Sequence, residues 1–399
     1  MTLSNIIYLD NAATTRISST VREVMEPYLD NLYGNASSLY SLGRESARAI
    51  HKARMDIAEA LNCDPCEIYF TSGGSESNNW AVKSAAALAA KSGKKHIISS
   101  EFEHHAVLHV LQALEKQGFE VTYLPVYENG IVRVSDLEKA FRPDTGFCTL
   151  MHVNNEIGTI QPVSDIGALC KAHGILFHSD AVQALGSVKF DISVLNADLL
   201  SLSGHKIHAP KGIGALCVNN KIRLPPYIVG GAQESGLRAG TENVAGIVGF
   251  AKAVQEAVSG TEAKNSKLLP LKEKLCKEIM KLEKVHLNGD PEQRVVTNLN
   301  FSFEGIEGES LLLMLDMAGI CCSSGSACTS GSLDPSHVLL ALGLPHEIAH
   351  GSLRISMSQY TTEAEIDKLL EVLPGIINKL RIMSPLWERI KNQCSIQKK

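Results

Sequence analysis

A lysine in the middle of the chain is the first candidate for covalent chemistry. Lys206 lies in Ser203-Gly204-His205-Lys206-Ile207, directly after the apolar, strand-like run 197–202. A lysine just beyond a buried strand is partly desolvated, and desolvation disfavours its ammonium form. The neutral amine can form a Schiff base with an aldehyde. Because a lone lysine of this kind is most often a surface residue on a loop, the assignment depends on which other residues reach the same region.

Three further motifs carry groups that would suit a phosphorylated pyridine. Residues 72–77 (Ser-Gly-Gly-Ser-Glu-Ser) follow a strand and open a helix, so they could hold one phosphate, although a capped turn is the simpler alternative. Asp180 ends a buried strand and could pair with the ring nitrogen of pyridoxal phosphate, with Gln183 near the phenolic oxygen; an N-cap aspartate is the alternative. His104 could stack on the ring and move protons near neutral pH, although a structural histidine is the usual alternative.

Alternating strands and helices would position these residues. We expect strands at 6–9, 67–71, 96–99, 121–126, 147–152, 175–180, 198–202 and 214–218, and helices at 18–32, 44–61, 75–90, 104–117, 135–141 and 164–173. This alternation predicts an α/β fold with a mainly parallel sheet covered by helices on both faces. Ligands bind beyond the carboxyl ends of such strands, and polar residues follow five of those ends: Ser72-Gly73-Gly74, His104, Asn155, Asp180 and Lys206.

The pattern changes near Gly260. Helices at 241–258 and 264–283 precede a strand at 298–303, a helix at 309–318, a strand at 352–357 and a last helix at 362–383. We therefore expect a large domain at 17–260, and a smaller α+β domain formed by 1–16 with 261–399. The one long Gly/Ser-rich loop, 321–334, falls in the smaller domain, and long loops inside compact domains are usually functional or mobile.

Composition excludes several classes of protein. The 399 residues are 44% hydrophobic and 20% charged, as in ordinary globular proteins. A net charge of -5 argues against a general binder of nucleic acid or of anionic membranes. No run approaches the length of a membrane span, and the first residues show no signal or transit pattern, so we expect a cytoplasmic protein.

Ten cysteines in such a chain are more often reduced than paired in disulfides. Four of them lie in apolar patterns that predict core packing: Cys148, Cys170, Cys217 and Cys276. Cys63-Asp64-Pro65-Cys66 has C-x-x-C spacing, but no second pair follows at zinc spacing, and Asp-Pro favours a turn over a metal or redox site.

Taken together, the motifs resemble the cysteine desulfurases of the NifS/IscS type, in the aspartate-aminotransferase superfamily of pyridoxal-phosphate enzymes. The resemblance spans essentially the whole chain, from Tyr8-Leu9-Asp10-Asn11-Ala12-Ala13-Thr14-Thr15 to residues 384–388. Its most specific motifs are residues 203–206, residues 180–183 and the run 323–333, which contains Cys328. Residues 238–243 resemble the nitrogen-fixation branch more than the housekeeping one.

The resemblance implies a role for each matched residue. Lys206 would be the Schiff-base lysine, and the catalytic set would be Cys328, Lys206 and His104. The cofactor, pyridoxal 5'-phosphate, would be held by Gly74, Ser75, Asp180, Gln183, Ser203, His205 and Lys206, with Thr241 reaching in from the second subunit of a homodimer. The substrate carboxylate would be bound by Asn35, Asn155 and Arg354, since the arginine fork suits bidentate contact with a carboxylate.

The implied reaction converts L-cysteine to L-alanine and leaves a persulfide on Cys328. The sulfur would pass to an acceptor, for which an iron–sulfur scaffold protein is the expected partner. No metal of its own is implied, although Cys328 could ligate a cluster in a scaffold complex, and neither nucleic acid nor membrane is expected as a partner.

Three departures from the family pattern stand out. Ser75 replaces the usual Thr, His105 and Ala36 stand where Pro is common, and Cys322 is not part of the motif.

Two alternatives keep the same fold, namely a selenocysteine lyase and an aminotransferase. An aminotransferase has no need of Cys328 on a loop. A third alternative is a metal or iron–sulfur protein that uses Cys321, Cys322 and Cys328. It would leave Lys206 and Asp180 unexplained.

Overall fold

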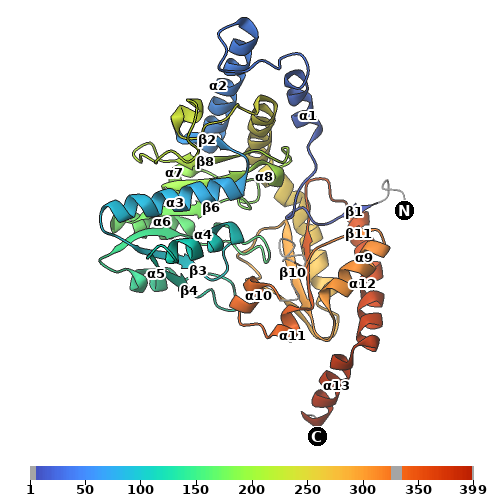
Figure 1. The fold of residues 1–399 in the computed structure, drawn as a ribbon. Coiled ribbons are helices and arrows are strands. Elements are labelled where there is room, and N and C mark those ends of the chain that lie inside the picture. Colours follow the sequence, from blue (N-terminus) through green and yellow to red (C-terminus); the bar gives the residue numbers. More distant parts are fainter. Residues whose placement is uncertain (1–5, 325–334, 398–399) are drawn as a thin grey trace.

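A computed structural model describes residues 6–324 and 335–397, with side chains described through residue 391. Its larger part is built on a seven-stranded sheet (Figure 1). The strand order is β2 (Ile68–Thr71), β8 (Gly214–Val218), β7 (Leu199–Ser203), β6 (Leu176–Asp180), β5 (Thr145–Thr149), β3 (His96–Ser100) and β4 (Glu120–Leu124). From β7 to β4 every neighbouring pair is parallel, whereas β8 runs antiparallel to both β2 and β7.

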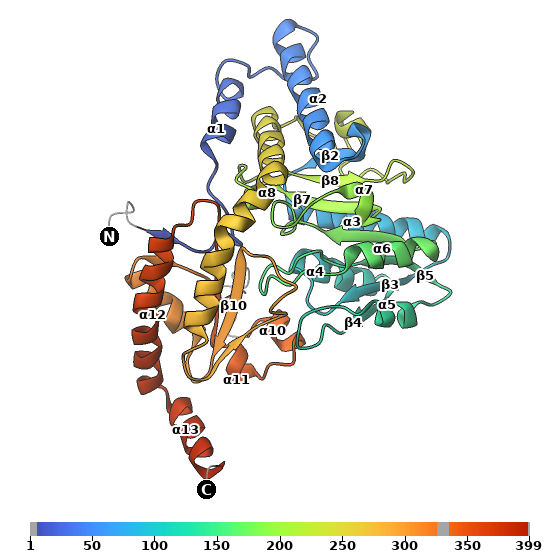
Figure 2. The same cartoon turned by 180° about the vertical axis from the view of Figure 1, so that it is seen from behind.

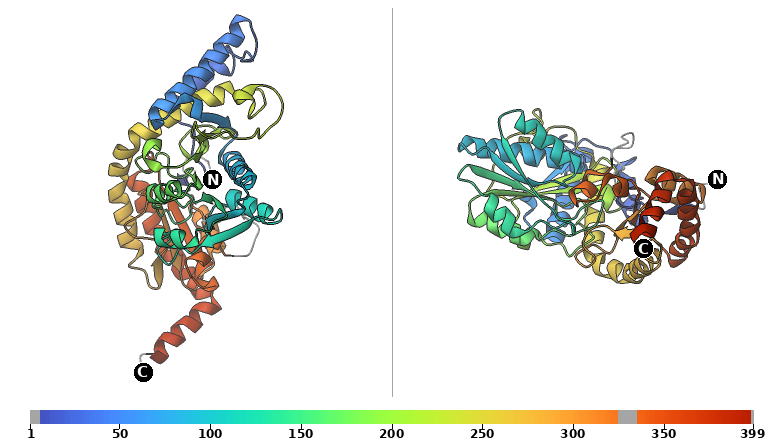
Figure 3. Two further views of the ribbon diagram at one scale, coloured as in Figure 1. Left: turned by 90° about the vertical axis from the view of Figure 1, so that its left-hand side faces the viewer. Right: turned by 90° about the horizontal axis from the view of Figure 1, so that it is seen from below.

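Helices cover both faces of this sheet, as the right-hand view of Figure 3 shows. They are α3 (Gly74–Lys91), α4 (His105–Glu115), α5 (Val134–Ala140), α6 (Val163–Ala172) and the short α7 (Ile192–Leu195). Every residue of β3, β5, β7 and β8 is buried, as expected for strands enclosed on two sides. The prediction of an α/β fold with a mainly parallel sheet is therefore confirmed, and the strand bounds differ from the predicted ones by at most three residues.

The smaller part is α+β. Its three-stranded antiparallel sheet has the order β12 (Ser352–Ser356), β10 (Asn298–Phe303) and β9 (Val285–Leu287). Strand β9 was not predicted from the sequence. The N-terminal strand β1 (Ile7–Tyr8) pairs in parallel with β11 (Ile320–Cys321). The helices are α9 (Gly308–Met317), α10 (His337–Ala341), α11 (His346–Ala349), α12 (Glu363–Met383) and α13 (Pro385–Gln397).

One long helix corrects the predicted pattern between the two parts. The sequence predicted two helices separated near Gly260, but α8 (Val244–Ile279) runs through Gly260 as one 36-residue helix (Figure 2). Phe250 and Val254 in its first half belong to the core of the larger part, while Leu268 and Leu275 belong to the core of the smaller one. A helix-interior glycine costs only about 1 kcal/mol, which burial at both ends outweighs. The boundary predicted at residue 260 falls inside this helix, and the domain limits stay a prediction.

The N-terminal helices also differ from the prediction. Helix α1 (Ser19–Met25) and the 3-10 turn η2 (Glu26–Tyr28) replace the helix expected over 18–32, because Pro27 has no N–H to continue the α-helical ladder. Helix α2 (Ser41–Leu61) begins three residues before the expected start. Figure 1 shows α1 and α2 projecting from one end of the molecule. Within the described residues, no helix is both long and apolar enough to cross a bilayer.

Candidate active site

Ten predicted residues line one cavity of about 600 Å³, at the ends of β2, β3, β5, β6 and β7. They are Gly74, Ser75, His104, Asn155, Asp180, Gln183, Ser203, His205, Lys206 and Arg354. Nine come from the larger part of the chain, and Arg354 comes from β12 in the smaller part. The sheet thus gathers polar groups from separate segments, as the strand-end rule predicts.

The N-terminus of α3 forms a cradle at one end of the cavity. A Cβ on Gly74 would lie only 2.7 Å from Val182 Cγ2, so only glycine lets the backbone come this close. The N–H groups of the first helical turn have no acceptor within the helix, and they favour an anion. Ser203 Oγ is buried nearby and has no hydrogen-bond partner among the described residues. These features suit a single phosphate group.

His205 lies beside the cradle as a neutral ring. Its Nδ1 lies 3.1 Å from Thr14 Oγ1. Burial, helped by the charges of Lys206 and Lys211, lowers the pKa of His205 to about 4. At pH 7 the imidazole is therefore uncharged, and it can offer a hydrogen bond to an anion without adding a positive charge.

Asp180 is held in a fixed orientation at the end of β6. Its Oδ2 accepts a hydrogen bond from Asn78 Nδ2 at 2.6 Å, and its Oδ1 accepts one from the Val182 N–H at 3.0 Å. Asn78 was not predicted as a site residue. It lies four residues after Gly74 on α3, and that helical spacing could have indicated that the two face the same way.

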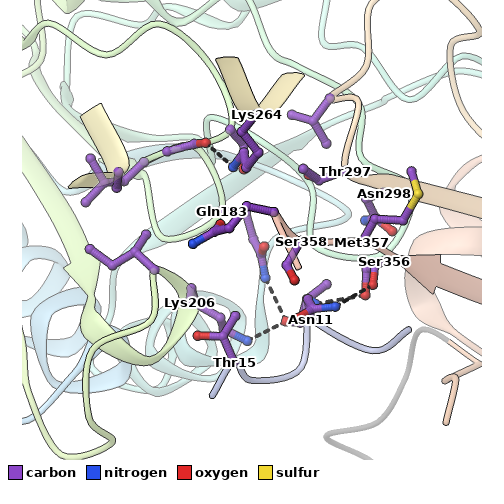
Figure 4. Close-up of a pocket in the computed structure, with 18 of the residues that line it drawn as sticks. Asn11, Thr15, Gln183, Lys206, Lys264, Thr297, Asn298, Ser356, Met357 and Ser358 are labelled. Carbon is purple, nitrogen blue, oxygen red and sulfur yellow. Dashed lines mark hydrogen bonds between the residues drawn. The ribbon is translucent and has the colours of Figure 1, made fainter. Parts of the chain in front are cut away.

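Lys206 meets a turn from the N-terminus of the chain. Its Nζ donates to the carbonyl oxygens of Ala12 at 2.6 Å and Ala13 at 2.8 Å. Gln183 Nε2 donates to the same Ala12 oxygen at 3.0 Å (Figure 4). The turn is anchored on the smaller part of the chain, because Asn11 Nδ2 donates to the Ser356 carbonyl at 2.9 Å.

Arg354 brings a buried positive charge to the wall of the cavity. Its side chain pairs with Asp10, with Nη2 2.8 Å from Oδ1, and its Nη1 donates to the Asn155 carbonyl at 3.0 Å. His104 lines the same cavity, and its Nδ1 accepts a hydrogen bond from the Ala106 N–H at 3.1 Å. The cavity therefore combines an amine, an anion cradle, an oriented carboxylate and an arginine.

Comparison with known proteins gives the family. Residues 7–369 match the model of the family described as Aminotransferase class-V. The chain belongs to this family. Among its relatives, the cysteine desulfurase IscS of Methanosarcina thermophila is 52% identical over 385 residues, 96% of this chain and 95% of the relative.

Two solved structures are also similar over most of the chain. A NifS-like protein is 38% identical with a TM-score of 0.89, covering 94% of this chain and 100% of that one. A structure described as SspA in complex with cysteine is 38% identical with a TM-score of 0.78, covering 89% and 99%.

Class-V aminotransferases are pyridoxal-phosphate enzymes, and the cavity fits that cofactor. The Gly74 cradle and the unpartnered Ser203 hydroxyl would suit its phosphate. Asp180 would hold the protonated pyridine nitrogen, and Lys206 offers the amine for its aldehyde. The fold therefore supplies a partner for each end of the cofactor.

Two predicted residues, Asn35 and Thr241, do not line this cavity. Asn35 is exposed on the loop before α2, where its Oδ1 accepts from the Ser37 N–H at 2.9 Å. Thr241 is exposed just before α8. Cys328 lies outside the described residues.

Cys321 and Cys322, which precede the run 323–333, do not readily form thiolates. Burial raises the pKa of Cys322, and burial together with the charges of Asp316 and Asp10 raises that of Cys321. Among the described residues, no group of three or more His, Cys, Asp and Glu side chains could hold a metal ion.

The other cysteines follow the sequence-based interpretation closely. Cys148, Cys170 and Cys217 are buried, and Cys276 is half-buried. Cys63 and Cys66 lie at a 3-10 turn with an Asp64–Glu67 capping box, in agreement with the turn predicted at Asp64-Pro65.

Proposed function

We propose that this chain is a pyridoxal-phosphate-dependent cysteine desulfurase, which converts L-cysteine to L-alanine and carries the sulfur on Cys328. The observation that carries the proposal is the cavity itself, where Lys206, Asp180, the Gly74 cradle and Arg354 meet. The desulfurase name of the relative from Methanosarcina thermophila and the cysteine bound in the SspA structure support the substrate.

The chain's own residues would divide the work of the reaction. Pyridoxal phosphate, when bound, withdraws electrons from the substrate and makes its Cα proton acidic. Lys206 would take up that proton, and Arg354 would hold the substrate carboxylate in a bidentate contact. Asn155 would assist at the carboxylate, as would Asn35, for which this role rests on the resemblance alone.

Sulfur transfer would fall to Cys328. Its thiolate attacks the substrate sulfur, so that an S–S bond forms while the C–S bond breaks and its electron pair goes to carbon. The carbon gains a proton and leaves as alanine, and Cys328 keeps the sulfur as a persulfide. His104, which lines the cavity, would manage the proton at the substrate sulfur.

We also propose a homodimer. Large apolar side chains are exposed on the segment between α1 and α2: Leu29 is 63%, Tyr33 is 74% and Leu39 is 89% exposed. Exposed apolar residues gathered on one projection favour an interface. Thr241, exposed in the single chain, would reach the phosphate of the second subunit. Sedimentation should then give twice the chain mass of 43.1 kDa.

The function is tested by incubating the holoenzyme with L-cysteine and a reductant. We expect alanine and sulfide in equal amounts and no keto acid. A keto acid in place of sulfide would identify an aminotransferase. A parallel reaction with L-selenocysteine compares the lyase alternative, and turnover of selenocysteine alone would contradict the proposal. An iron–sulfur scaffold protein is the acceptor we propose for the sulfur.

Arg354→Ala is expected to raise KM for cysteine by about thirtyfold or more, because truncating one partner of a buried charge contact costs about 2–5 kcal/mol. Steady-state kinetics measure this, and the cofactor absorbance of the variant shows whether the cofactor still binds. Arg354→Lys is the matched control. It keeps the charge opposite Asp10 but loses the fork, so its KM should fall between the two. An unchanged KM in Arg354→Ala would remove Arg354 from the substrate site.

A further inference from the structure

A second cavity of about 370 Å³ adjoins the active site. The two cavities share Ala12, Val153, Gln183 and Lys206 in their walls. The second cavity extends away from the Gly74 cradle, toward α8 and the segment that follows β12. Its volume lies in the range of small-molecule sites. None of the residues that face only this cavity has a role in the proposed desulfurase reaction.

Two lysines one helical turn apart on α8 give this cavity its charge. Lys264 Nζ donates to the Gly186 carbonyl in the larger part of the chain. Lys267 Nζ donates to the Gln359 carbonyl, after β12, at 2.5 Å. Neither lysine forms an ion pair within the described residues. Because an ammonium has three N–H donors, each lysine keeps donors for a further acceptor.

Among the described residues of the cavity wall, Glu256 is the one carboxylate, and hydrogen bonds and a lysine already compensate its charge. Glu256 accepts hydrogen bonds from Thr20 Oγ1 at 2.5 Å and from Ser18 Oγ at 3.3 Å, and it lies 3.4 Å from Lys252 Nζ. In the part of the chain that the structure describes, the two lysines therefore line the cavity without a negative partner of their own. Burial also lowers the pKa of Lys264 to about 8, which reflects how little solvent or counter-charge reaches this ammonium.

The rest of the wall suits a molecule with a short carbon skeleton. Leu185, Val295 and Met357 supply apolar surface, and Thr15 and Ser358 supply hydroxyls. In Figure 4, Lys264 lies on one side of the cavity, and Asn298 and Met357 lie on another. Asn298 is buried and its side-chain oxygen has no partner among the described residues. Inorganic phosphate would use the lysines but leave the apolar surface uncovered.

We propose that this cavity is a second binding site, for a small organic carboxylate held by Lys264 and Lys267. The ligand would contact both parts of the chain, because its wall includes Gly186 from one and Gln359 from the other. It would also contact Asn11. Asn11 directly precedes Ala12 and Ala13, whose carbonyl oxygens accept hydrogen bonds from Lys206 Nζ. Occupancy is therefore coupled to the environment of Lys206.

Calorimetric titration of the full-length holoenzyme with succinate tests the site. We expect saturable binding that weakens at least about tenfold in Lys264→Gln and in Lys267→Gln, because each variant loses a charge-assisted contact. Lys277→Gln is the matched control: it removes the same charge from an exposed position of α8 and should bind succinate normally. Succinate should also shift the cofactor absorption band of the wild type, since Lys206 borders both cavities.

Two further titrations test where succinate binds and whether the site prefers a carboxylate to phosphate. Arg354→Ala should keep the succinate affinity. If it loses that affinity while Lys264→Gln and Lys267→Gln retain it, the anion occupies the substrate site and the proposal is wrong. Inorganic phosphate should bind more weakly than succinate, and equal or tighter binding of phosphate would overturn the carboxylate assignment. Absence of saturable succinate binding in the wild type would overturn the site altogether. These outcomes are independent of desulfurase activity.

Discussion

Lys206→Ala should abolish covalent attachment of the cofactor and lower turnover by at least about a thousandfold. General acid–base catalysis alone typically contributes 10²–10⁴, and Lys206 would also provide the attachment point. Borohydride reduction of the wild type followed by peptide mass spectrometry should place a pyridoxyl group on Lys206. In the variant no lysine should carry it, while pyridoxal phosphate can still bind through the Gly74 cradle and Asp180.

Lys211 provides a matched control for this experiment. It lines the same cavity and has the same side chain, but among the described residues no hydrogen bond ties it to the Ala12–Ala13 turn. Lys211→Ala should keep the pyridoxyl group on Lys206. A pyridoxyl group on Lys211 in the wild type would show that the wrong amine had been assigned.

Cys328→Ser should bind both cofactor and cysteine yet form no persulfide, with turnover reduced by several orders of magnitude, as when an enzyme loses its nucleophile. The thiolate is the reactive form of cysteine. Burial raises the pKa values of Cys321 and Cys322, so these neighbours stay protonated at neutral pH and cannot replace it. Mass spectrometry after treatment with L-cysteine, without reductant, reads the added sulfur directly.

Cys321→Ser and Cys322→Ser are the controls for the persulfide. Both should still acquire the added sulfur on Cys328. An added sulfur on Cys321 or Cys322 of the wild type, with Cys328 unmodified, would mean that the nucleophile is misassigned. Iodoacetamide treatment of the wild type as the pH is raised should label Cys328 before Cys321 or Cys322, because the residues next to Cys328 in the sequence are small.

Much of the active site could be predicted because its groups lie at strand ends, and strand ends are local features of a sequence. Asp180 and Lys206 each follow a short apolar run, so their place at one edge of the sheet followed from the α/β pattern. The Gly74 cradle was visible for the same reason, as a glycine pair between a strand and a helix.

Contacts between distant segments could not be predicted in this way. Nothing in the local pattern indicates that Asp10 pairs with Arg354, or that the Ala12 and Ala13 carbonyls accept from Lys206. The prediction for helix α8 was wrong for a related reason. Its continuity through Gly260 depends on the two hydrophobic cores that bury its ends, and helix propensities contain no information about those cores. Asn35 and Thr241 lie away from the cavity in the single chain, and the sequence alone could not show that.

The contact between Asp10 and Arg354 also sets the order in which the molecule can be completed during its synthesis. The two residues are 344 positions apart, so the first leaves the ribosome long before the second is made. At about 5–20 residues per second the interval is roughly 20 to 70 s. During that time β1 has no β11 to pair with, and the Asn11–Ala13 turn has no Ser356 to hold it. The sheet that carries Asp180 and Lys206 can form early, but the wall that encloses them comes last. Firm retention of pyridoxal phosphate therefore belongs to the finished chain, and a nascent chain stalled before β12 should bind it only loosely.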